Sequence, residues 1–341
     1  MTRALRLAAV GAAAALALVL AGCSKPATTS SSTPKSGAAA ASNKKLSIGF
    51  FGFAKANSFA QATWAGIQGY AATHNATATF IDSNFDGPTQ VNELQDAVVA
   101  KRYNIVIVQA NDGTAMVQPV KQAVQAGITV VIEFTPVGGK YNTAAPQIPG
   151  TINIIDPPTV NGVGLARLGL EACKTVTSGK CNVAYLQGFA NYPLDTARTA
   201  AAVAALKAGG ATVVSNFVGG YTSDSGRAAM QNLLQADPGV NVVIGSSQAL
   251  EGATPLAKGK KIAFVGNGGS TQAFGFVNSG VWFGDYDVPE RSEGAKAAQL
   301  GIEKARGQNV PDTQVACQVL TTFSCLGTKQ TLQGQTATYS D

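Results

Sequence analysis

The stretch NIVIVQANDGTAMVQPVKQAVQAGITVVIEF, residues 104–134, carries the pattern that indicates the fold class. It contains two continuous apolar runs, NIVIVQ at 104–109 and ITVVIEF at 128–134. Such runs are typical of parallel strands that are covered on both faces. Between them, Asn111-Asp112 is expected to cap a helix that ends near Gly127. The stretch therefore predicts one strand–helix–strand unit of a parallel sheet.

The same alternation continues on both sides of this unit. Strands are expected at 45–51 and 77–82, and helices are expected to follow Asn57-Ser58 and to open at Asp86-Gly87-Pro88. A second series begins at residue 182, with strands at 182–188, 211–220, 241–247, 261–269 and 280–288 and helices at 196–209 and 225–236. Two such series predict an α/β protein with two doubly wound parallel-sheet lobes.

The N-terminal segment has the pattern of a targeting signal. An apolar run from Leu7 to Ala21 follows Arg3 and Arg6 and is too short for a membrane span of about 20 residues. LAGC at residues 20–23 resembles the bacterial lipoprotein signal, which implies a signal peptide over 1–22 and lipidation of Cys23. Residues 24–43 contain no large apolar side chain and are expected to be a flexible tether. These features predict an extracytoplasmic domain held at the cell membrane by a lipid anchor.

Charge and cysteine content narrow the class further. Residues 1–45 hold six of the 25 lysines and arginines and no acid, so the rest of the chain carries 19 basic and 19 acidic residues. A nucleic-acid partner therefore has no electrostatic support. Outside the cytoplasm, the two local cysteine pairs predict the disulfides Cys173–Cys181 and Cys317–Cys325. A metal site is not expected, because the cysteine spacing is unsuitable and His74 is the only histidine.

Candidate site residues come from the predicted strand ends, because ligands of such sheets bind beyond the carboxyl ends of the strands. Aromatic rings, amides, carboxylates and one arginine recur there, a mixture that suits a small polar ligand. No cofactor is expected. The predicted ligand-binding residues are Phe51, Asn57, Phe59, Gln109, Glu133, Phe134, Tyr192, Arg198, Tyr221, Ser246, Gln248, Asn267 and Asp287.

Several of these stretches together resemble a periplasmic solute-binding protein of the ribose/galactose type, the substrate-capturing part of an ABC importer. The resemblance runs from Lys45 to about Leu320 and is carried by residues 47–71, 104–134, 185–206 and 230–253. It implies that Asn57 and Phe59 touch a sugar and that Arg198 clamps its hydroxyls. It also implies a monomer that captures a small molecule between closing lobes and delivers it to an ABC permease.

The resemblance further implies the type I periplasmic binding protein fold, in which a three-segment hinge joins the lobes. The crossing segments are expected near 153–157, 286–289 and 310–314. The N-terminal lobe would comprise 44–154 and 288–312, and the C-terminal lobe 155–287 and 313–330, with a tail at 331–341.

Three departures from the family pattern concern the ligand. Where ribose binders usually carry Asp-Arg, Asn-Asp and Asp, this chain has Glu133-Phe134-Thr135, Ser246-Ser247 and Asn267-Gly268-Gly269. The loss of these charged groups argues against ribose and glucose themselves. It favours a polyol, a deoxy-sugar, a modified pentose or another ring compound.

Two other functional classes remain open. A lipoprotein that senses the same ligand for a signalling receptor would have the same fold and site. An extracellular carbohydrate-active enzyme could use a carboxylate pair such as Glu133 and Asp287, although His74 is expected far from the strand ends. For the binding protein, Arg198→Ala is predicted to abolish binding without unfolding the domain.

Overall fold

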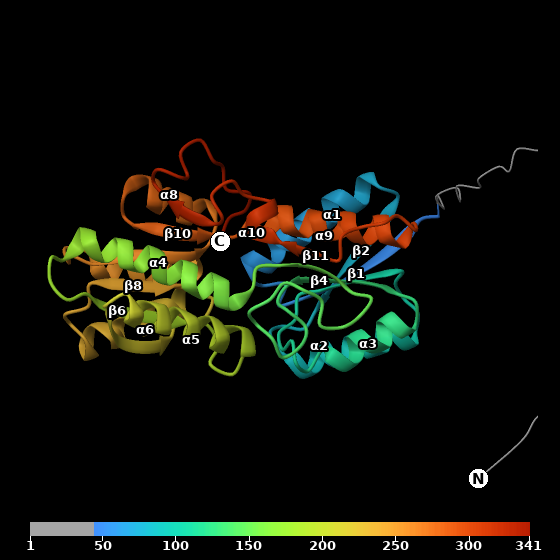
Figure 1. Ribbon diagram of the computed structural model, residues 1–341, viewed down its shortest axis with the longest axis horizontal. Coiled ribbons are helices and arrows are strands. Elements are labelled where there is room, and N and C mark those ends of the chain that lie inside the picture. The colour runs from blue at the N-terminus through green and yellow to red at the C-terminus, as the bar shows by residue number, and fades with distance from the viewer. Residues whose placement is uncertain (1–43) are drawn as a thin grey trace, which may run out of the picture. The chain divides into compact units, whose positions relative to one another are not determined.

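The computed structural model describes residues 44–341, and Figure 1 shows two lobes, each built on one sheet. The predicted signal peptide, lipidated Cys23 and tether therefore lie outside the described residues. The first sheet has the order β11-β5-β4-β3-β1-β2 and the second has the order β12-β10-β9-β8-β6-β7. All neighbours that pair are parallel except β12, which runs antiparallel to β10.

The strands of the first sheet are β1 (Leu46–Gly52), β2 (Ala76–Asp82), β3 (Ile105–Val108), β4 (Thr129–Phe134), β5 (Ile152–Ile155) and β11 (Thr313–Val315). Those of the second sheet are β6 (Asn182–Gln187), β7 (Thr212–Val218), β8 (Val242–Gly245), β9 (Ala263–Gly268), β10 (Gly284–Asp287) and β12 (Leu326–Thr328).

The helices of the first lobe are α1 (Ser58–Thr73), α2 (Gly87–Val99), α3 (Val117–Gln125) and α9 (Glu290–Ala305). Those of the second are α4 (Pro158–Val176), α5 (Pro193–Ala208), α6 (Ser223–Ala236), α7 (Ser247–Ala253) and α8 (Thr271–Ser279); a 3-10 turn covers Thr254–Ala257, and the short α10 (Ala316–Val319) follows β11.

The continuous apolar runs are explained by helices on both faces of each sheet. Along β3, Ile105 and Ile107 pack in a core with α1 and α9, whereas Val106 and Val108 pack in a core with α2 and α3. The second sheet is covered by α4 and α5 on one face and by α6, α7 and α8 on the other. Successive side chains of a strand point to opposite faces, so both sets must be apolar.

The third helix begins later than predicted. The carboxylate of Asp112 accepts hydrogen bonds from the backbone N–H groups of Thr114 and Ala115 at 2.8 and 3.0 Å. These contacts stabilise a turn after β3, and α3 starts only at Val117. Asp and Asn side chains support turns by the same local hydrogen bonds that cap helices, and here the turn prevails.

The chain passes between the lobes three times, and both lobes belong to one compact unit. The passages follow β5, follow β10 and lie between β11 and β12. Because β11 pairs with β5, the first sheet extends three residues beyond the division predicted at residue 312. After β10, α9 returns to the first lobe and lies beside α1 (Figure 1). An added Cβ on Gly66 of α1 would lie 1.9 Å from the carbonyl oxygen of Arg291, so this approach requires glycine.

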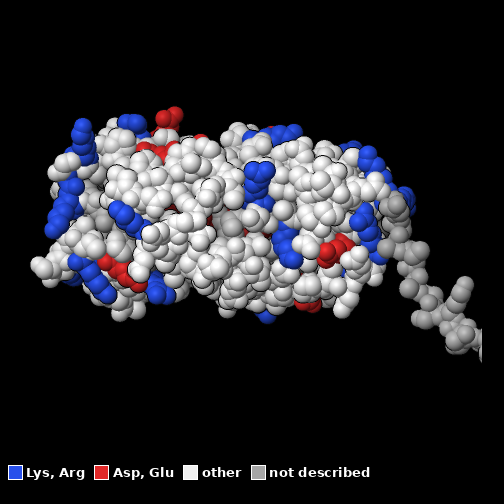
Figure 2. Space-filling view, turned by 90° about the horizontal axis from the view of Figure 1, so that it is seen from above, with Lys and Arg blue, Asp and Glu red and all other residues white. Residues whose placement is uncertain are grey.

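Both predicted disulfides are present in the structure. Cys173–Cys181 joins the end of α4 to the chain just before β6, and Cys317–Cys325 closes the loop between α10 and β12. None of the helices within residues 44–341 combines the length and apolarity that a membrane crossing requires. On the face shown in Figure 2, the lysines and arginines of this part of the chain are scattered instead of forming one patch.

Candidate functional site

A cavity lies where the carboxyl ends of the strands of the two lobes face each other. It has an empty volume of ≈ 500 Å³, part of which is open to solvent. The first lobe supplies about half of the lining and the second supplies the rest. The lining residues are Phe53, Asn57, Phe59, Phe85, Ala110, Asn111 and Phe134 from the first lobe, and Tyr192, Leu194, Arg198, Tyr221, Gln248 and Asn267 from the second.

Aromatic rings dominate the wall and meet across the lobes. In the first lobe, Phe53 stacks on Phe85 with 6.2 Å between ring centroids, and Phe59 meets Phe134 edge-on at 4.8 Å. Phe85 also stacks on Tyr221 of the second lobe at 6.3 Å and 10°. The hydroxyl group of Tyr192 donates a hydrogen bond to the carbonyl oxygen of Phe85, so the lobes are directly linked at this rim.

Two of these phenylalanines have a left-handed backbone. The φ angles are 59° at Phe85 and 56° at Phe134, in a region that bulky residues seldom adopt. Such conformations cost about 1–3 kcal/mol and gather at functional sites, where the surrounding structure holds them in place. At Phe134 part of that support is a hydrogen bond from its backbone N–H to Oε1 of Glu293, at 3.2 Å.

Arg198 is the one cationic side chain among the described lining residues. It lies in the first half of α5, is 5% exposed, and its guanidinium carbon lies 5.8 Å from the centre of the Phe134 ring. Its Nη1 lies 3.4 Å from Oδ1 of Asp195, one turn earlier on the helix. Its Nε has no hydrogen-bond partner among residues 44–341. A buried guanidinium with an unused N–H can bind an oxygen of a ligand.

Asp195 lies behind the wall and is occupied by protein donors. Its carboxylate accepts hydrogen bonds from the backbone N–H of Phe189 at 2.7 Å, from the hydroxyl of Tyr221 and from Arg198. Burial raises the pKa of Asp195, and the guanidinium of Arg198 opposes that rise. Three converging donors are what an ionised carboxylate needs in a buried place, so the Asp195–Arg198 pair has no net charge.

Four amides supply the remaining polar groups, and each is oriented by one protein contact. Asn57 accepts from the backbone N–H of Ala60 as the N-cap of α1, and Asn267 accepts from Nδ2 of Asn161 at 3.0 Å. Their NH2 groups remain for a ligand, and each oxygen keeps a second lone pair.

The other two amides present oxygens. Asn111 donates to Oγ of Ser83 at 2.8 Å, and its Oδ1 has no partner among the described residues. Gln248 donates from Nε2 to Oγ of Ser58 at 3.2 Å, a contact between the lobes that leaves its carbonyl oxygen. Each of the four amides uses one hydrogen bond to the protein and can still both donate to and accept from a ligand.

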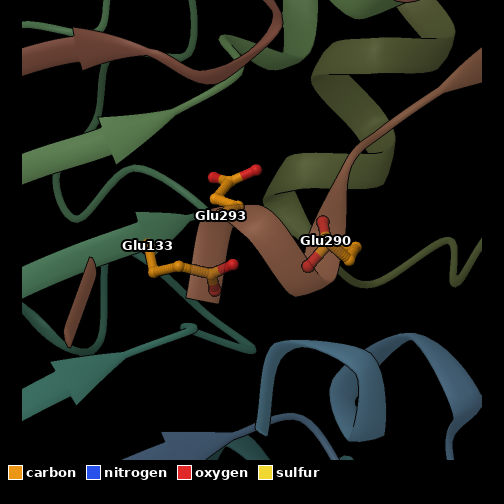
Figure 3. Close-up of side chains that lie close together, drawn as sticks. All are labelled: Glu133, Glu290 and Glu293. Carbon is orange, nitrogen blue, oxygen red and sulfur yellow. The ribbon is translucent and has the colours of Figure 1, made fainter. Parts of the chain in front are cut away.

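Three buried glutamates lie next to the wall without lining it. Glu133 comes directly before Phe134, the last residue of β4, and Glu290 and Glu293 lie in the first turn of α9 (Figure 3). One carboxylate oxygen from each lies within 4.8 Å of the others. Burial raises the pKa of Glu133 to about 8, and burial together with the nearby Glu133 raises the pKa values of Glu290 and Glu293. These groups are therefore mainly uncharged acids at neutral pH.

The structure brings eight of the predicted residues to the cavity: Asn57, Phe59, Phe134, Tyr192, Arg198, Tyr221, Gln248 and Asn267. The other five lie elsewhere. Phe51 is in the core beneath α2 and α3, because its position in β1 directs it away from the cavity. Gln109 is buried. Its Nε2 donates a hydrogen bond to Oγ1 of Thr63, and its Oε1 accepts one from the backbone N–H of Phe53.

The remaining three also have structural contacts. Glu133 belongs to the glutamate cluster. Ser246 caps α7, accepting from the backbone N–H of Ala249 and donating to the carbonyl oxygen of Gly220. Asp287 lies at the end of β10 and lines a separate hollow that includes Thr321. Burial raises the pKa of Asp287 to about 7.

Five lining residues are not in the predicted ligand-binding set: Phe53, Phe85, Ala110, Asn111 and Leu194. Phe53, Ala110 and Asn111 follow β1 and β3 directly, so the strand-end rule that found their neighbours also covers them. Phe85 follows β2, whose carboxyl end lies at the same edge. Only Leu194, in the first turn of α5, has no sequence signal of its own.

The last residues of the sequence contact both lobes near the cavity. The carbonyl oxygen of Tyr339 accepts from the backbone N–H and hydroxyl of Thr271 at the start of α8, both at 2.8 Å. Asp341 accepts from Oγ of Ser58 in the first lobe at 2.7 Å. The ring of Tyr339 meets the lining residue Phe59 edge-on at 6.4 Å. This segment thus supports the wall from outside.

Comparison with known proteins agrees with this architecture. A family model described as the periplasmic binding protein domain matches residues 48–309. An ABC transporter periplasmic solute binding protein from Actinobacillus succinogenes 130z, solved with bound D-allose, is 18% identical, with a TM-score of 0.72 and coverage of 85% of this chain and 100% of that one. No match was found among curated proteins.

Two further solved structures are similar. A solute binding protein from Agrobacterium vitis, bound with alpha-D-tagatopyranose, is 20% identical, with a TM-score of 0.72 and coverage of 87% of this chain and 100% of that one. One from Mycobacterium smegmatis, with bound glycerol, is 21% identical, with a TM-score of 0.69 and coverage of 87% and 99%. At this identity the likeness is one of fold.

The chain therefore belongs to the periplasmic binding protein domain family. Its two parallel-sheet lobes form the type I periplasmic binding protein fold, which confirms the fold and the family resemblance predicted from the sequence. Membership makes it a ligand-binding protein and not an enzyme, and implies a location outside the cytoplasm.

Proposed function

We propose that this protein captures a small sugar or polyol between its two lobes and delivers it to an ABC permease. The observation that carries the proposal is a cavity with rings, amides and one arginine contributed by both lobes. Only closed lobes provide all of these contacts at once, so ligand binding would favour closure. The solved proteins of similar fold that hold D-allose and alpha-D-tagatopyranose support this ligand class.

Within this proposal each group has one task. The rings of Phe59 and Phe134 cover apolar faces of the ligand, and Arg198 binds its oxygens. The amides of Asn57, Asn111, Gln248 and Asn267 bind the remaining polar groups. The hydrogen bond from Tyr192 to Phe85 and the contact of Gln248 with Ser58 hold the lobes together around the ligand.

Lipid anchoring at Cys23 is the second part of the proposal. A lipid-bearing cysteine and a tether of about 20 residues would keep the binding lobes near a permease in the same membrane. The segment itself carries the support, since LAGC at 20–23 follows a short apolar run. Metabolic labelling with a radioactive fatty acid should mark the protein, and Cys23→Ala should remove the label.

A thermal-shift screen with pentoses, hexoses, deoxy-sugars and polyols tests ligand capture. A ligand present at about 100 times its Kd should add about 2.7 kcal/mol of stability. A stabilising compound should then bind with one-to-one stoichiometry in calorimetry and be recovered unchanged. Recovery of a chemically altered product would contradict a pure binding function.

Arg198 is the sharpest target for mutation, but its burial changes the choice of variant. Arg198→Ala would leave the Asp195 carboxylate buried and unpaired, at a cost of about 3–5 kcal/mol, so the loss of binding would be mixed with a loss of stability. Arg198→Lys keeps the positive charge and removes the planar fork. We expect it to weaken binding about tenfold or more with little change in stability. Arg227→Lys, on the exposed face of α6, is the matched control.

A further inference from the structure

We propose that the ligand is a small uncharged ring compound with few hydroxyl groups and an apolar face on each side, such as a deoxygenated or O-alkylated sugar or cyclitol. This inference rests on the proposed function and narrows it. Its basis is the balance between apolar wall, hydrogen-bond acceptors and charge in the cavity.

The apolar wall surrounds the ligand from both lobes. Four phenylalanines come from the first lobe, and two tyrosines and Leu194 come from the second. The Phe53, Phe85 and Tyr221 rings lie nearly parallel, with interplanar angles of 19° and 10° between neighbours. Flat apolar walls favour C–H faces and aliphatic substituents over hydroxyl groups, which lose water there without replacement.

Hydroxyl donors of a ligand find no charged acceptor among the described lining residues of this cavity. No carboxylate lines the cavity among the described residues. Asp195 is occupied by three protein donors, and Glu133 belongs to the buried cluster behind Phe134. The amide oxygens with no protein donor are Oδ1 of Asn111 and the carbonyl oxygen of Gln248, and the oxygens of Asn57 and Asn267 each keep one lone pair.

The acceptors of the cavity limit the number of hydroxyl groups that a ligand can carry. The two tyrosine hydroxyls already donate to protein atoms, and their oxygens are weaker acceptors than a carboxylate. A hexose has five hydroxyl protons, each of which needs a hydrogen-bond acceptor. Each one left without an acceptor lowers affinity by about ten- to a hundredfold. Because the remaining side-chain acceptors of the lining are neutral, each ligand hydroxyl gains less on binding than it would from a carboxylate, and a ligand with fewer hydroxyls is favoured.

The charges at the cavity wall favour a neutral ligand. The only cation of the described lining, Arg198, is balanced by Asp195, so an anionic ligand would meet a negative charge directly behind the guanidinium. The unused donors of the lining include Nε of Arg198 and the NH2 groups of Asn57 and Asn267. Ether, carbonyl or O-alkyl oxygens of the ligand would accept from them without supplying a proton.

Calorimetry with matched pyranoses tests the inference. In the first series, the protein is titrated with D-glucose, D-galactose and D-mannose, with their 6-deoxy and 2,6-dideoxy counterparts, and with the methyl glycosides of each. The second series consists of myo-inositol and its O-methyl and deoxy derivatives. We expect Kd to fall as hydroxyls are removed or methylated, by about tenfold or more between the ends of the best series.

Each outcome separates the two proposals. If a fully hydroxylated sugar or cyclitol binds as tightly as its deoxygenated counterparts, the inference is overturned and capture of a sugar or polyol stands. If no sugar, polyol or derivative binds, both proposals fail. Tightest binding by a carboxylate-bearing sugar would also overturn the inference, because it contradicts the neutral ligand.

One variant tests the cause directly. Asn267→Asp keeps the oxygen that accepts from Asn161 and replaces the NH2 donor with a carboxylate oxygen facing the cavity. It should move the preference toward compounds with more hydroxyls by about fivefold or more. Asn92→Asp, on an exposed position of α2, adds the same charge away from the cavity and should leave the preference unchanged. An unchanged preference in Asn267→Asp as well would refute the acceptor argument.

Discussion

Replacing Glu133 by glutamine should make the protein more stable, and increasingly so as the pH rises. Burial raises the pKa of Glu133 to about 8, from 4.5 for an ordinary glutamate. The folded protein therefore keeps this proton between about pH 4.5 and pH 8, whereas the unfolded chain releases it. The stability that the protonated group provides is complete below about pH 4.5 and is lost as pH rises toward 8.

The size of the effect follows from proton linkage. One proton held only by the folded state changes the free energy of unfolding by about 1.36 kcal/mol per pH unit. Between pH 5 and pH 7 the wild-type protein should thus lose about 2–3 kcal/mol through Glu133 alone. The pKa values of Glu290 and Glu293 are raised as well, so they act in the same direction.

Urea denaturation at several pH values between 5 and 8 measures this. Glu133→Gln has nearly the same shape and does not titrate, so its advantage over wild type should grow by about 2–3 kcal/mol from pH 5 to pH 7. Glu171→Gln changes the same net charge at a side chain that is 40% exposed and serves as the control. A constant difference between Glu133→Gln and wild type across this range would contradict the raised pKa of Glu133, and so would a wild type that gains stability with pH.

Three further perturbations address the rim, a disulfide and the C-terminal segment. Tyr192→Phe removes the hydrogen bond between the lobes and should raise the ligand Kd about two- to tenfold in calorimetry; an unchanged Kd would mean that the bond does not favour closure. Serine at both Cys173 and Cys181 should lower the free energy of unfolding by about 2–3 kcal/mol in urea titrations, and a loss near zero would show that the disulfide is dispensable. Tyr339→Ala removes the edge contact with Phe59 and should weaken ligand binding several-fold, by about 1 kcal/mol. The exposed Thr338→Ala should not, and equal effects in both would count against this role of Tyr339.

Much of the fold could be predicted from the sequence because its signals are local. Continuous apolar runs of four to seven residues mark strands such as β3 and β4, and this pattern requires helices on both faces of the sheet. The alternation of strand and helix then leaves few topologies. The start of α3 was placed too early because Asp112 supports a turn as readily as a cap, and only packing distinguishes the two.

The candidate site could be predicted only in part. The strand-end rule identifies a set of positions, but it does not say which way each side chain points. Phe51 and Phe53 are two residues apart. Phe51 is buried in the hydrophobic core beneath α2 and α3, whereas Phe53, beyond the end of β1, lines the cavity. Phe85 lines the cavity with a left-handed backbone conformation, which the residue type does not indicate.

The amino-acid sequence is enough to predict the two lobes, the parallel sheets, the disulfide pairs and the edge at which a ligand would bind, since periodicity, cysteine spacing and strand order are properties of neighbouring residues. The contacts of each polar group, in contrast, depend on the folded structure. It placed Glu133 in a buried cluster with two glutamates from the returning helix α9, paired Arg198 with Asp195, and brought Tyr192 against Phe85. The glutamate cluster joins β4 to α9, and the contact of Tyr192 with Phe85 joins the two lobes, whereas Arg198 and Asp195 both lie in α5. The free energy that buries all three sets of residues comes from packing across the whole chain.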